Sequence, residues 1–344
     1  MRAAGGQIAP SEHARRTLIS VLGSTPSVRV SCGGTDSLFG EYGERPASDS
    51  AAASKYRPDP APVSARTCFD AAQDTLRHDS DRTENIMPRT IVDLSVFLEN
   101  DVMSDPPGHG PHIEYIDHKA SIPGMLGFFP GLQAADLPDG EAWAIERVTL
   151  ITHNGTHLDA PYHYASTMDG GKRAITIDEV PLDWCFQSGV KLDFRHFPDG
   201  YVVSAADVEA ELQRIGHTLS PLEIVVVNTR AGMRFGHDDY VASGCGMGRD
   251  ATLYLTERGV RVTGTDAWSW DAPFVHTAAR YAESGDATLI WEGHKAGRDI
   301  GYCHIEKLHN LEQLPATGFT IACFPVKIRA ASAGWTRAVA ILDG

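Results

Sequence analysis

Residues 152–164 read THNGTHLDAPYHY and hold three histidines and one aspartate in the pattern H-x3-H-x-D-x3-H. Imidazole nitrogens and carboxylate oxygens are ligands that zinc, manganese and iron accept. Gly155 and Pro161 interrupt the stretch, which favours a shaped loop over a regular helix. We therefore interpret residues 152–164 as a metal-binding loop around which the rest of the chain is organised.

The spacing suggests separate roles for the four side chains. His153, His157 and Asp159 are close enough in sequence to bind one ion if the chain turns at Gly155. Three protein ligands leave one coordination position open for water, which is typical of a catalytic rather than a structural site. His163 is then a candidate base or acid beside that water. The alternative is that these histidines cap loops and bond to backbone groups, but their density in one short loop favours the metal site.

Composition narrows the possible function classes. The formal net charge of −15 argues against nucleic acid or an anionic membrane as a partner. No apolar run approaches the roughly 20 residues that are needed to span a bilayer. The six cysteines are scattered without a C-x-x-C pair, which indicates free thiols in a reducing compartment. We therefore expect a cytoplasmic protein whose partner is a small-molecule substrate.

Two regions of the chain differ in composition. Residues 1–86 are rich in Ala, Ser, Gly, Pro and Arg and show no sustained hydrophobic period, so we predict a mostly disordered extension. Residues 14–22 faintly resemble a twin-arginine signal, but their apolar part is too short to favour export. From Met87 the pattern is that of a globular chain, and residues 87–344 are predicted to form a single domain.

Apolar runs predict both strands and helices in the globular part. The strand at 142–151 leads directly into the metal-binding loop and would fix its position. Helices alternate with strands only in the second half, so the predicted class is α/β with a mixed sheet. The predicted strands are 90–98, 142–151, 189–194, 223–229, 260–265, 287–291, 319–328 and 337–342, and the predicted helices are 204–215, 250–258 and 273–283.

A second group of possible ligands lies downstream, where the strand predicted at 287–291 ends. His294 and Glu306 could complete a two-metal site in which a carboxylate bridges both ions. On the residues alone this pair is a weak candidate, because neighbouring side chains compete for the same role. Those competitors are Glu292, His304 and His309, and any of them could also be a solvated surface group.

Aromatic residues near these loops are candidates for a substrate pocket. Residues 122–132 are apolar but broken by Pro and Gly, and form either a mobile flap or a hairpin packed on the body. Residues 264–273 follow a strand, and their two tryptophans either stack an aromatic substrate or form a buried pair. The candidate pocket residues are Phe128, Phe129, Tyr162, Trp268 and Trp270.

The motif H-x-G-T-H-x-D-x-P-x-H, from His153 to His163, resembles the signature of the metal-dependent cyclase/hydrolase superfamily, the "putative cyclase" family. That family includes kynurenine formamidase and isatin hydrolase. The resemblance runs from about Thr90 to Leu342. It implies a swivelling β/β/α fold and a homodimer or higher homo-oligomer in which the partner helps to shape the pocket.

The resemblance also implies a ligand set and a cofactor. Its pattern assigns His153, His157 and Asp159 to a first metal and makes His163 the proton donor and acceptor. A histidine and a glutamate twelve residues apart complete the family's site, and His294 and Glu306 have this spacing. The implied cofactor is one or two divalent ions, Zn²⁺ or Mn²⁺. The loop at 104–108 lacks the tryptophan that kynurenine formamidases carry near their start, so the substrate can differ.

Three functions are compatible with these residues. We expect hydrolysis of a C–N bond in an amide, formamide or lactam of a small aromatic substrate, because a divalent metal lowers the pKa of bound water and His163 can shuttle a proton. The alternative is a polyketide-type cyclase or dehydratase that uses the same metal site. A third interpretation is a non-catalytic, metal-containing binding protein.

Overall fold

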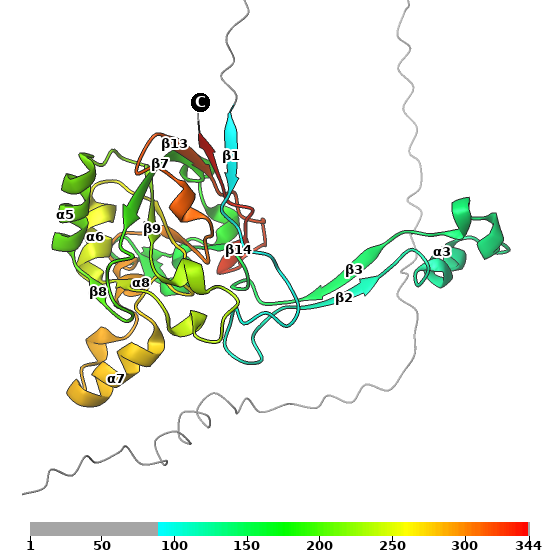
Figure 1. Cartoon of the computed structure of the whole chain (residues 1–344), viewed down its shortest axis with the longest axis horizontal. Coiled ribbons are helices and arrows are strands. Elements are labelled where there is room, and N and C mark those ends of the chain that lie inside the picture. Colours follow the sequence, from blue (N-terminus) through cyan, green and yellow to red (C-terminus); the bar gives the residue numbers. More distant parts are fainter. Residues whose placement is uncertain (1–88, 343–344) are drawn as a thin grey trace, which may run out of the picture. The chain divides into compact units, whose positions relative to one another are not determined.

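The computed structural model describes residues 89–342 of the 344-residue chain. The extension predicted at 1–86 lies outside the described residues. The described part contains a nine-stranded mixed sheet with helices packed against it (Figure 1). The predicted mixed α/β class is therefore confirmed. None of the helices among residues 89–342 combines the length and the apolar character needed to cross a membrane.

The central sheet is parallel in its middle and antiparallel at both sides. Strands β7, β9, β11 and β12 run parallel to one another, and the remaining strands join them in antiparallel pairs. In spatial order the sheet consists of β1 (Thr90–Asp93), β15 (Val339–Leu342), β13 (Phe319–Ala322), β7 (Phe186–Asp193), β9 (Ile224–Asn228), β11 (Val262–Thr265), β12 (Cys303–Glu306), β4 (His157–Asp159) and β14 (Ala333–Trp335).

Helices and short strand pairs complete the chain. Helix α5 begins at a capping box in which Ser204 and Asp207 exchange hydrogen bonds, and it ends at Gly216 with φ of 67°. The helices are α3 (Ile122–Phe128), α4 (Pro161–Tyr164), α5 (Ala205–Ile215), α6 (Arg249–Glu257), α7 (Phe274–Ser284) and α8 (Glu292–Ala296). The short strands pair as β2 (His112–Ile116) with β3 (Ile145–Thr149), β5 (Thr167–Met168) with β6 (Lys172–Arg173), and β8 (Val202–Val203) with β10 (Gly246–Met247).

Strand periodicity divides the apolar core between the two faces of the sheet. In β9, Val225 and Val227 pack against Val208 and Leu255 of the helices α5 and α6. Their neighbours Ile224 and Val226 join a second cluster on the other face. Successive side chains of a strand point to opposite faces, so both clusters draw on the same strands. The predicted strand at 223–229 is thus confirmed as one that is buried on both sides.

Strands β2 and β3 form a two-stranded ribbon that extends away from the central sheet (Figure 1). They pair only with each other, and the segment between them, which includes α3, forms the end of this arm. No residue of α3 or β3 is buried. Residues 122–132 are therefore neither a hairpin packed on the body nor a flap over it, because the paired strands carry them outward. We refer to residues 112–149 as the arm.

One predicted strand is wrong. Residues 287–291 form a 3-10 turn, Ala287–Leu289, followed by helix α8, rather than a strand. The side chain of Asp286 accepts a hydrogen bond from the backbone N–H of Thr288 and so starts the turn. Trp291 then adopts the left-handed region with φ of 62° and directs the chain into α8. The β-branched and apolar character of the run was misleading because this local capping outweighs it.

Candidate metal centre

The predicted metal ligands meet where strand β4 pairs with strand β12. In this antiparallel ladder Asp159 lies opposite His304, and His157 lies opposite Glu306. Leu158 and Ile305 point to the apolar core on one face. Their polar neighbours in both strands point to the other face, as the period of two requires. Strand pairing thereby joins the two stretches of sequence that were singled out separately.

The first half of the centre comes from the loop at 152–164. Oδ1 of Asp159 lies 2.9 Å from Nδ1 of His153 and 3.3 Å from Nε2 of His157. These three residues offer ligand atoms that all lie within 4.8 Å of one another. The loop turns at Gly155, whose φ is 59°, so the predicted turn at that glycine is present.

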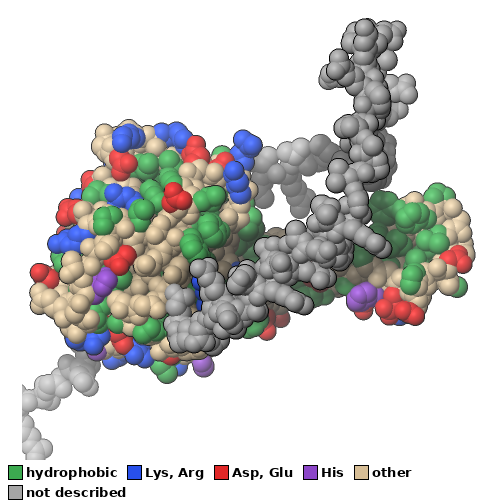
Figure 2. All heavy atoms as spheres, turned by 90° about the horizontal axis from the view of Figure 1, so that it is seen from above, with side chains coloured by type: hydrophobic (Ala, Val, Ile, Leu, Met, Phe, Trp, Pro, Cys, Tyr) green, Lys and Arg blue, Asp and Glu red, His purple; other side chains and the backbone are tan. Residues whose placement is uncertain are grey.

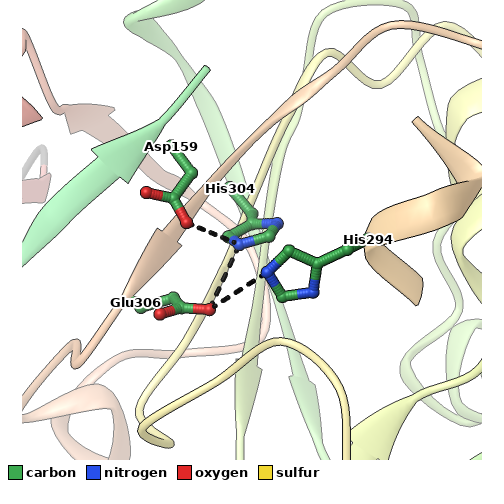
Figure 3. A group of neighbouring side chains, drawn as sticks. All are labelled: Asp159, His294, His304 and Glu306. Atoms are coloured by element: carbon green, nitrogen blue, oxygen red, sulfur yellow. Dashed lines mark ion pairs between the residues drawn. The ribbon is translucent and has the colours of Figure 1, made fainter. Parts of the chain in front are cut away.

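The second half combines β4 with the downstream segment. Asp159, His294, His304 and Glu306 form another group whose ligand atoms lie within 4.8 Å of one another (Figure 3). Oε1 of Glu306 is 3.7 Å from Nε2 of His294 and 3.2 Å from Nε2 of His304. Its other oxygen, Oε2, is 3.6 Å from Nε2 of His157 in the first half. Both carboxylates therefore reach into both halves.

The lone pairs of these residues fit a divalent cation. Nε2 of His157, both oxygens of Asp159 and Nε2 of His304 are buried, and none of them makes a hydrogen bond. Buried polar atoms normally have a partner, because leaving them unpaired costs about 1–3 kcal/mol each. Nitrogen and oxygen atoms that lie side by side without hydrogen-bonding geometry are arranged as ligands of a shared cation.

The outward-facing ring nitrogens are held by neighbouring groups. Nδ1 of His157 lies 2.9 Å from the carbonyl of Gly155, and Nδ1 of His294 bonds to the carboxylate of Asp271. Asp271 also accepts from the backbone N–H groups of residues 293 and 294. A hydrogen bond of this kind fixes the tautomer and orientation of a metal-binding imidazole. In both residues it leaves Nε2 free to face the centre.

The electrostatics of the centre are those of anions embedded among histidines. Burial favours the neutral form of Asp159, but the surrounding histidines hold its pKa well below the usual range. Burial opposes ionisation of Glu306 as well, yet the neighbouring imidazoles of His304 and His157 lower its pKa to about 2. The two carboxylates are thus ionised at neutral pH and attract a cation.

His163 lies at the rim of the centre. Its Nε2 is 3.7 Å from Oδ2 of Asp159, and 23% of its side chain is exposed. Burial lowers its pKa to about 4, so the imidazole is neutral at physiological pH and can accept a proton. The ring is 5.2 Å from the ring of Trp291, which in turn stacks on His294 at 4.5 Å.

The family model described as "Putative cyclase" matches residues 92–272, more than half of the chain. The chain belongs to the putative cyclase family. The predicted family is thereby confirmed. The matched range includes the whole metal-binding loop and ends before His294 and Glu306.

Individual proteins resemble this chain in sequence or in fold. The kynurenine formamidase of Erythrobacter litoralis is 27% identical over 205 residues, which cover 59% of this chain and 79% of that protein. Isatin hydrolase A from Labrenzia aggregata matches with a TM-score of 0.57 at 22% identity, over 79% of this chain and all of that one. Isatin hydrolase A from Ralstonia solanacearum matches with a TM-score of 0.58 at 20% identity, over 83% and 100%. The two isatin hydrolase structures share the fold of this chain.

The predicted pocket residues do not gather around the centre of this cyclase-family chain. Phe128 and Phe129 are exposed and belong to the end of the arm (Figure 1). Trp270 is fully buried, and its ring is nearly parallel to that of His304. It therefore packs behind the centre and does not line an open pocket. Trp268 is half-buried and donates to Asp105. Tyr162 is exposed beside His163.

Two important residues, Trp291 and Asp271, were missed as parts of the site. Trp291 contacts both His163 and His294, but the strand predicted at 287–291 hid its position. Asp271, which orients His294, gave no sequence signal because the two are distant in the chain. His304 was considered only as a competitor of His294 and Glu306, although its spacing of two from Glu306 places both side chains on one face of a strand.

A buried ion pair ties the loop at 104–108 to the back of the centre. The ammonium of Lys307 bonds to the carboxylate of Asp105 and also donates to the carbonyl of His153 at 2.9 Å. Asn154 donates to the same carboxylate at 3.1 Å. Lys307 directly follows Glu306, and its side chain is 1% exposed. Asp105 therefore connects Lys307, which is next to Glu306 in the second half of the centre, with Asn154, which is next to His153 in the first half.

Proposed function

We propose that this chain is a metal-dependent hydrolase that cleaves a C–N bond in an amide, formamide or lactam of a small aromatic substrate. The observation that carries the proposal is the convergence of unpaired, buried ligand atoms on the face shared by β4 and β12. His153, His157 and Asp159 would hold one ion, and His294 and Glu306 would complete the centre. A bound divalent ion supplies an electrophile and lowers the pKa of a water molecule that it binds.

His163 is the proton carrier in this proposal. Its neutral imidazole accepts a proton at Nε2 as water attacks the carbonyl carbon, and it returns that proton to the departing nitrogen. Asp159, 3.7 Å away, stabilises the imidazolium formed in between. His153 and His163 are equally exposed at 23%, but His153 lies 2.9 Å from Asp159 in the proposed ligand group. His163 lies outside the ligand groups, so it is the exposed histidine that is available to exchange protons with substrate.

An apolar recess beside Trp291 supports an aromatic substrate. A cavity of about 250 Å³ is lined by residues that include Phe274, Tyr281, Ile290 and Trp291. The indole of Trp291 also stacks on His294, so it adjoins both the recess and the centre. Aromatic rings gain free energy from stacked or edge-on contact with such a surface. The related kynurenine formamidase and the isatin hydrolases are named for aromatic substrates, which agrees with this choice.

The test is a substrate panel with isotopic labelling. We would assay formyl-anilides, isatin-type lactams and aryl esters with Zn²⁺ or Mn²⁺ added to the chelator-treated protein, in water enriched in ¹⁸O. Hydrolysis places one ¹⁸O atom in the carboxylic acid product. Conversion without that label would support the cyclase or dehydratase alternative instead. If metal binds and none of the panel is turned over, the proposed hydrolase function is wrong.

The role of His163 has a matched control. His163→Gln should retain the metal and lower kcat by at least about 100-fold, because general acid–base catalysis contributes about 10²–10⁴-fold. His217→Gln removes a half-buried histidine that pairs with Glu223 beyond the end of α5, and it should leave kcat unchanged. Equal activity of both variants would reject the proton-carrier role.

We also propose that a second copy of the chain covers the arm. An isolated two-stranded ribbon is marginally stable in water. Here the ribbon exposes Tyr115, Ile145 and Val148, and hydrophobic side chains lie over much of the visible surface of the arm (Figure 2). Apolar patches of this kind mark association surfaces. A dimer that becomes monomeric in light scattering when Val148→Asp is introduced would support the proposal; a wild-type monomer would contradict it.

The cysteines support a reducing compartment such as the cytoplasm. Cys185, Cys245, Cys303 and Cys323 are buried free thiols in the described part of the chain. Proteins of oxidising compartments tend to use cysteines in disulfides. Titration of free thiols in unfolded protein, purified without reductant, tests this proposal, since disulfides would lower the count.

A further inference from the structure

His304 is enclosed by both carboxylates of the centre (Figure 3). Its side chain is fully buried, and its Nε2 lies 3.1 Å from Oδ2 of Asp159 and 3.2 Å from Oε1 of Glu306. This nitrogen makes no hydrogen bond. The family motif does not assign His304, so its role must be derived from its own contacts.

The opposite ring nitrogen determines the tautomer. The hydroxyl of Tyr164 donates its single hydrogen to the carbonyl of Asp159 at 3.2 Å, and it lies 3.1 Å from Nδ1 of His304. The hydroxyl of Tyr302 donates to the carbonyl of Gly293 at 3.0 Å and lies 3.4 Å from the same Nδ1. With both hydroxyl hydrogens on these carbonyls, the hydroxyl oxygens face Nδ1 as acceptors, and this arrangement favours the tautomer with the hydrogen on Nδ1. In the neutral imidazole the lone pair is then on Nε2.

Aromatic packing fixes the direction of that lone pair. The imidazole is nearly parallel to the rings of Tyr164 and Trp270, at centroid distances of 5.0 Å and 5.8 Å and interplanar angles of 19° in both cases. The indole of Trp270 is itself held by a hydrogen bond to Thr252. A ring held in this way cannot turn its Nε2 away from the centre without disrupting the buried aromatic cluster.

The spacing of the surrounding atoms matches a metal site. With metal–ligand bonds of about 2.0–2.1 Å in a tetrahedron, ligand atoms lie about 3.3 Å apart. Nε2 of His304 is 3.1 Å and 3.2 Å from its two carboxylate oxygens, and Nε2 of His294 is 3.7 Å from Oε1 of Glu306. The oxygens on this side, Oδ2 and Oε1, differ from the oxygens that face His153 and His157.

The family pattern already implies that His294, Asp159 and Glu306 bind a second divalent ion of the Zn²⁺ or Mn²⁺ class. We propose that His304, which the pattern does not assign, is a further ligand of that ion. This inference rests on the proposed function for the first ion but not on any particular substrate. Asp159 and Glu306 each direct one oxygen toward His304 and the other toward His153 or His157, so both carboxylates could contribute to both ions. The competing state is a protonated His304 that neutralises both carboxylates without a second ion.

Metal content distinguishes these two states. The full chain would be stripped with a chelator, dialysed to equilibrium against Zn²⁺ or Mn²⁺, and measured by elemental analysis. We expect two ions per chain for the wild type and one for His304→Gln, with the affinity for the second ion lowered by more than about 100-fold. Unchanged stoichiometry and affinity in His304→Gln would overturn the proposal. His276→Gln is the matched control, because His276 is half-buried in α7 and bonds to a carbonyl outside the centre.

A second variant keeps the inference testable if His304→Gln does not fold. Tyr164→Phe retains His304 and the aromatic packing but removes the hydroxyl that faces Nδ1. It should weaken binding of the second ion by about 10–100-fold and spare the first. Equal affinity of both ions in Tyr164→Phe and wild type would reject the tautomer argument. Two bound ions without turnover of any tested substrate would refute the hydrolase function and leave this inference intact.

Discussion

Asp159 and His304 face each other across the ladder of β4 and β12, with 3.1 Å between Oδ2 and Nε2. The pair joins the two halves of the centre, because Oδ1 of the same carboxylate faces His153 and His157. Asp159 is therefore the residue on which both halves depend. Its neighbours across the strands are set by backbone register, so a shift of one residue would turn the ligands to the apolar face.

Asp159→Asn should abolish binding of metal at both positions. The amide removes a negative charge that is fully buried among four histidines and replaces one acceptor oxygen by a donor. Elemental analysis after dialysis should find less than about a tenth of an ion per chain, because the loss of a ligand lowers affinity by well over tenfold. Asp101→Asn is the control: Asp101 is exposed with φ of 61°, a conformation that Asn also adopts. Retention of metal by Asp159→Asn would contradict its bridging role.

Lys307→Met should be strongly destabilising. It leaves the buried carboxylate of Asp105 without its cation, and breaking a buried pair in this way costs about 3–5 kcal/mol of unfolding free energy. Arg337→Gln breaks the exposed pair with Asp93 and should cost less than about 1 kcal/mol. Urea unfolding of both variants measures the difference. Similar costs for the two changes would show that the Asp105–Lys307 pair is not held in a dry environment.

Gly246→Ala should weaken metal binding by displacing Asp271, although Gly246 itself is not a ligand. A Cβ atom there would lie 1.8 Å from the backbone nitrogen of Ala272 and 2.0 Å from the carbonyl carbon of Asp271, the residue that orients His294. We expect a loss of at least about 1–3 kcal/mol in unfolding free energy, together with weaker metal binding. Gly127→Ala has no heavy atom within 4 Å of the new Cβ and should change stability by less than about 1 kcal/mol. Wild-type metal affinity in Gly246→Ala would show that Asp271 tolerates displacement.

Asp266 should make stability depend on pH. Burial raises its pKa from 3.8 to about 7, although Thr229 donates to both of its oxygens. Because the folded pKa is above the unfolded one, the stabilisation is complete below pH 3.8 and is lost as pH rises toward 7. The slope reaches about 1.4 kcal/mol per pH unit in that window. Asp266→Asn should remove this component, and parallel curves of unfolding free energy against pH for the two proteins would contradict the assignment.

Secondary-structure elements that depend on residues close together in sequence were predicted correctly. The capping box at Ser204 and the apolar run at 223–229 each specify an element without reference to distant residues. The turn at 287–289 was mistaken for a strand because the capping effect of Asp286 competes with β-branched composition. The strand predicted at 142–151 is present as β3, but its pairing with β2 in an arm was not predicted, since nearly all residues of the two strands are exposed and show no alternating pattern.

The candidate site could be predicted only where its residues are adjacent in sequence or covered by a family pattern. His153, His157 and Asp159 form one loop, and the structure brings them together. The placement of His304 depends on the register of β12 against β4, which follows from the packing of the whole sheet. The same holds for Trp291, whose left-handed backbone aims its ring at His294.

The join between β4 and β12 also bears on how the molecule unfolds. The hydrogen-bonded residues Tyr164 and His304 are 140 positions apart, and the ladder beside them comprises only three residue pairs. Closing so long a loop has an entropic cost that a short ladder offsets only in part. Ions held by both strands would act as cross-links over that loop, so the holo form should resist mechanical and thermal opening along this seam far better than the apo form. Metal supply would then set the lifetime of the folded chain as well as its chemistry.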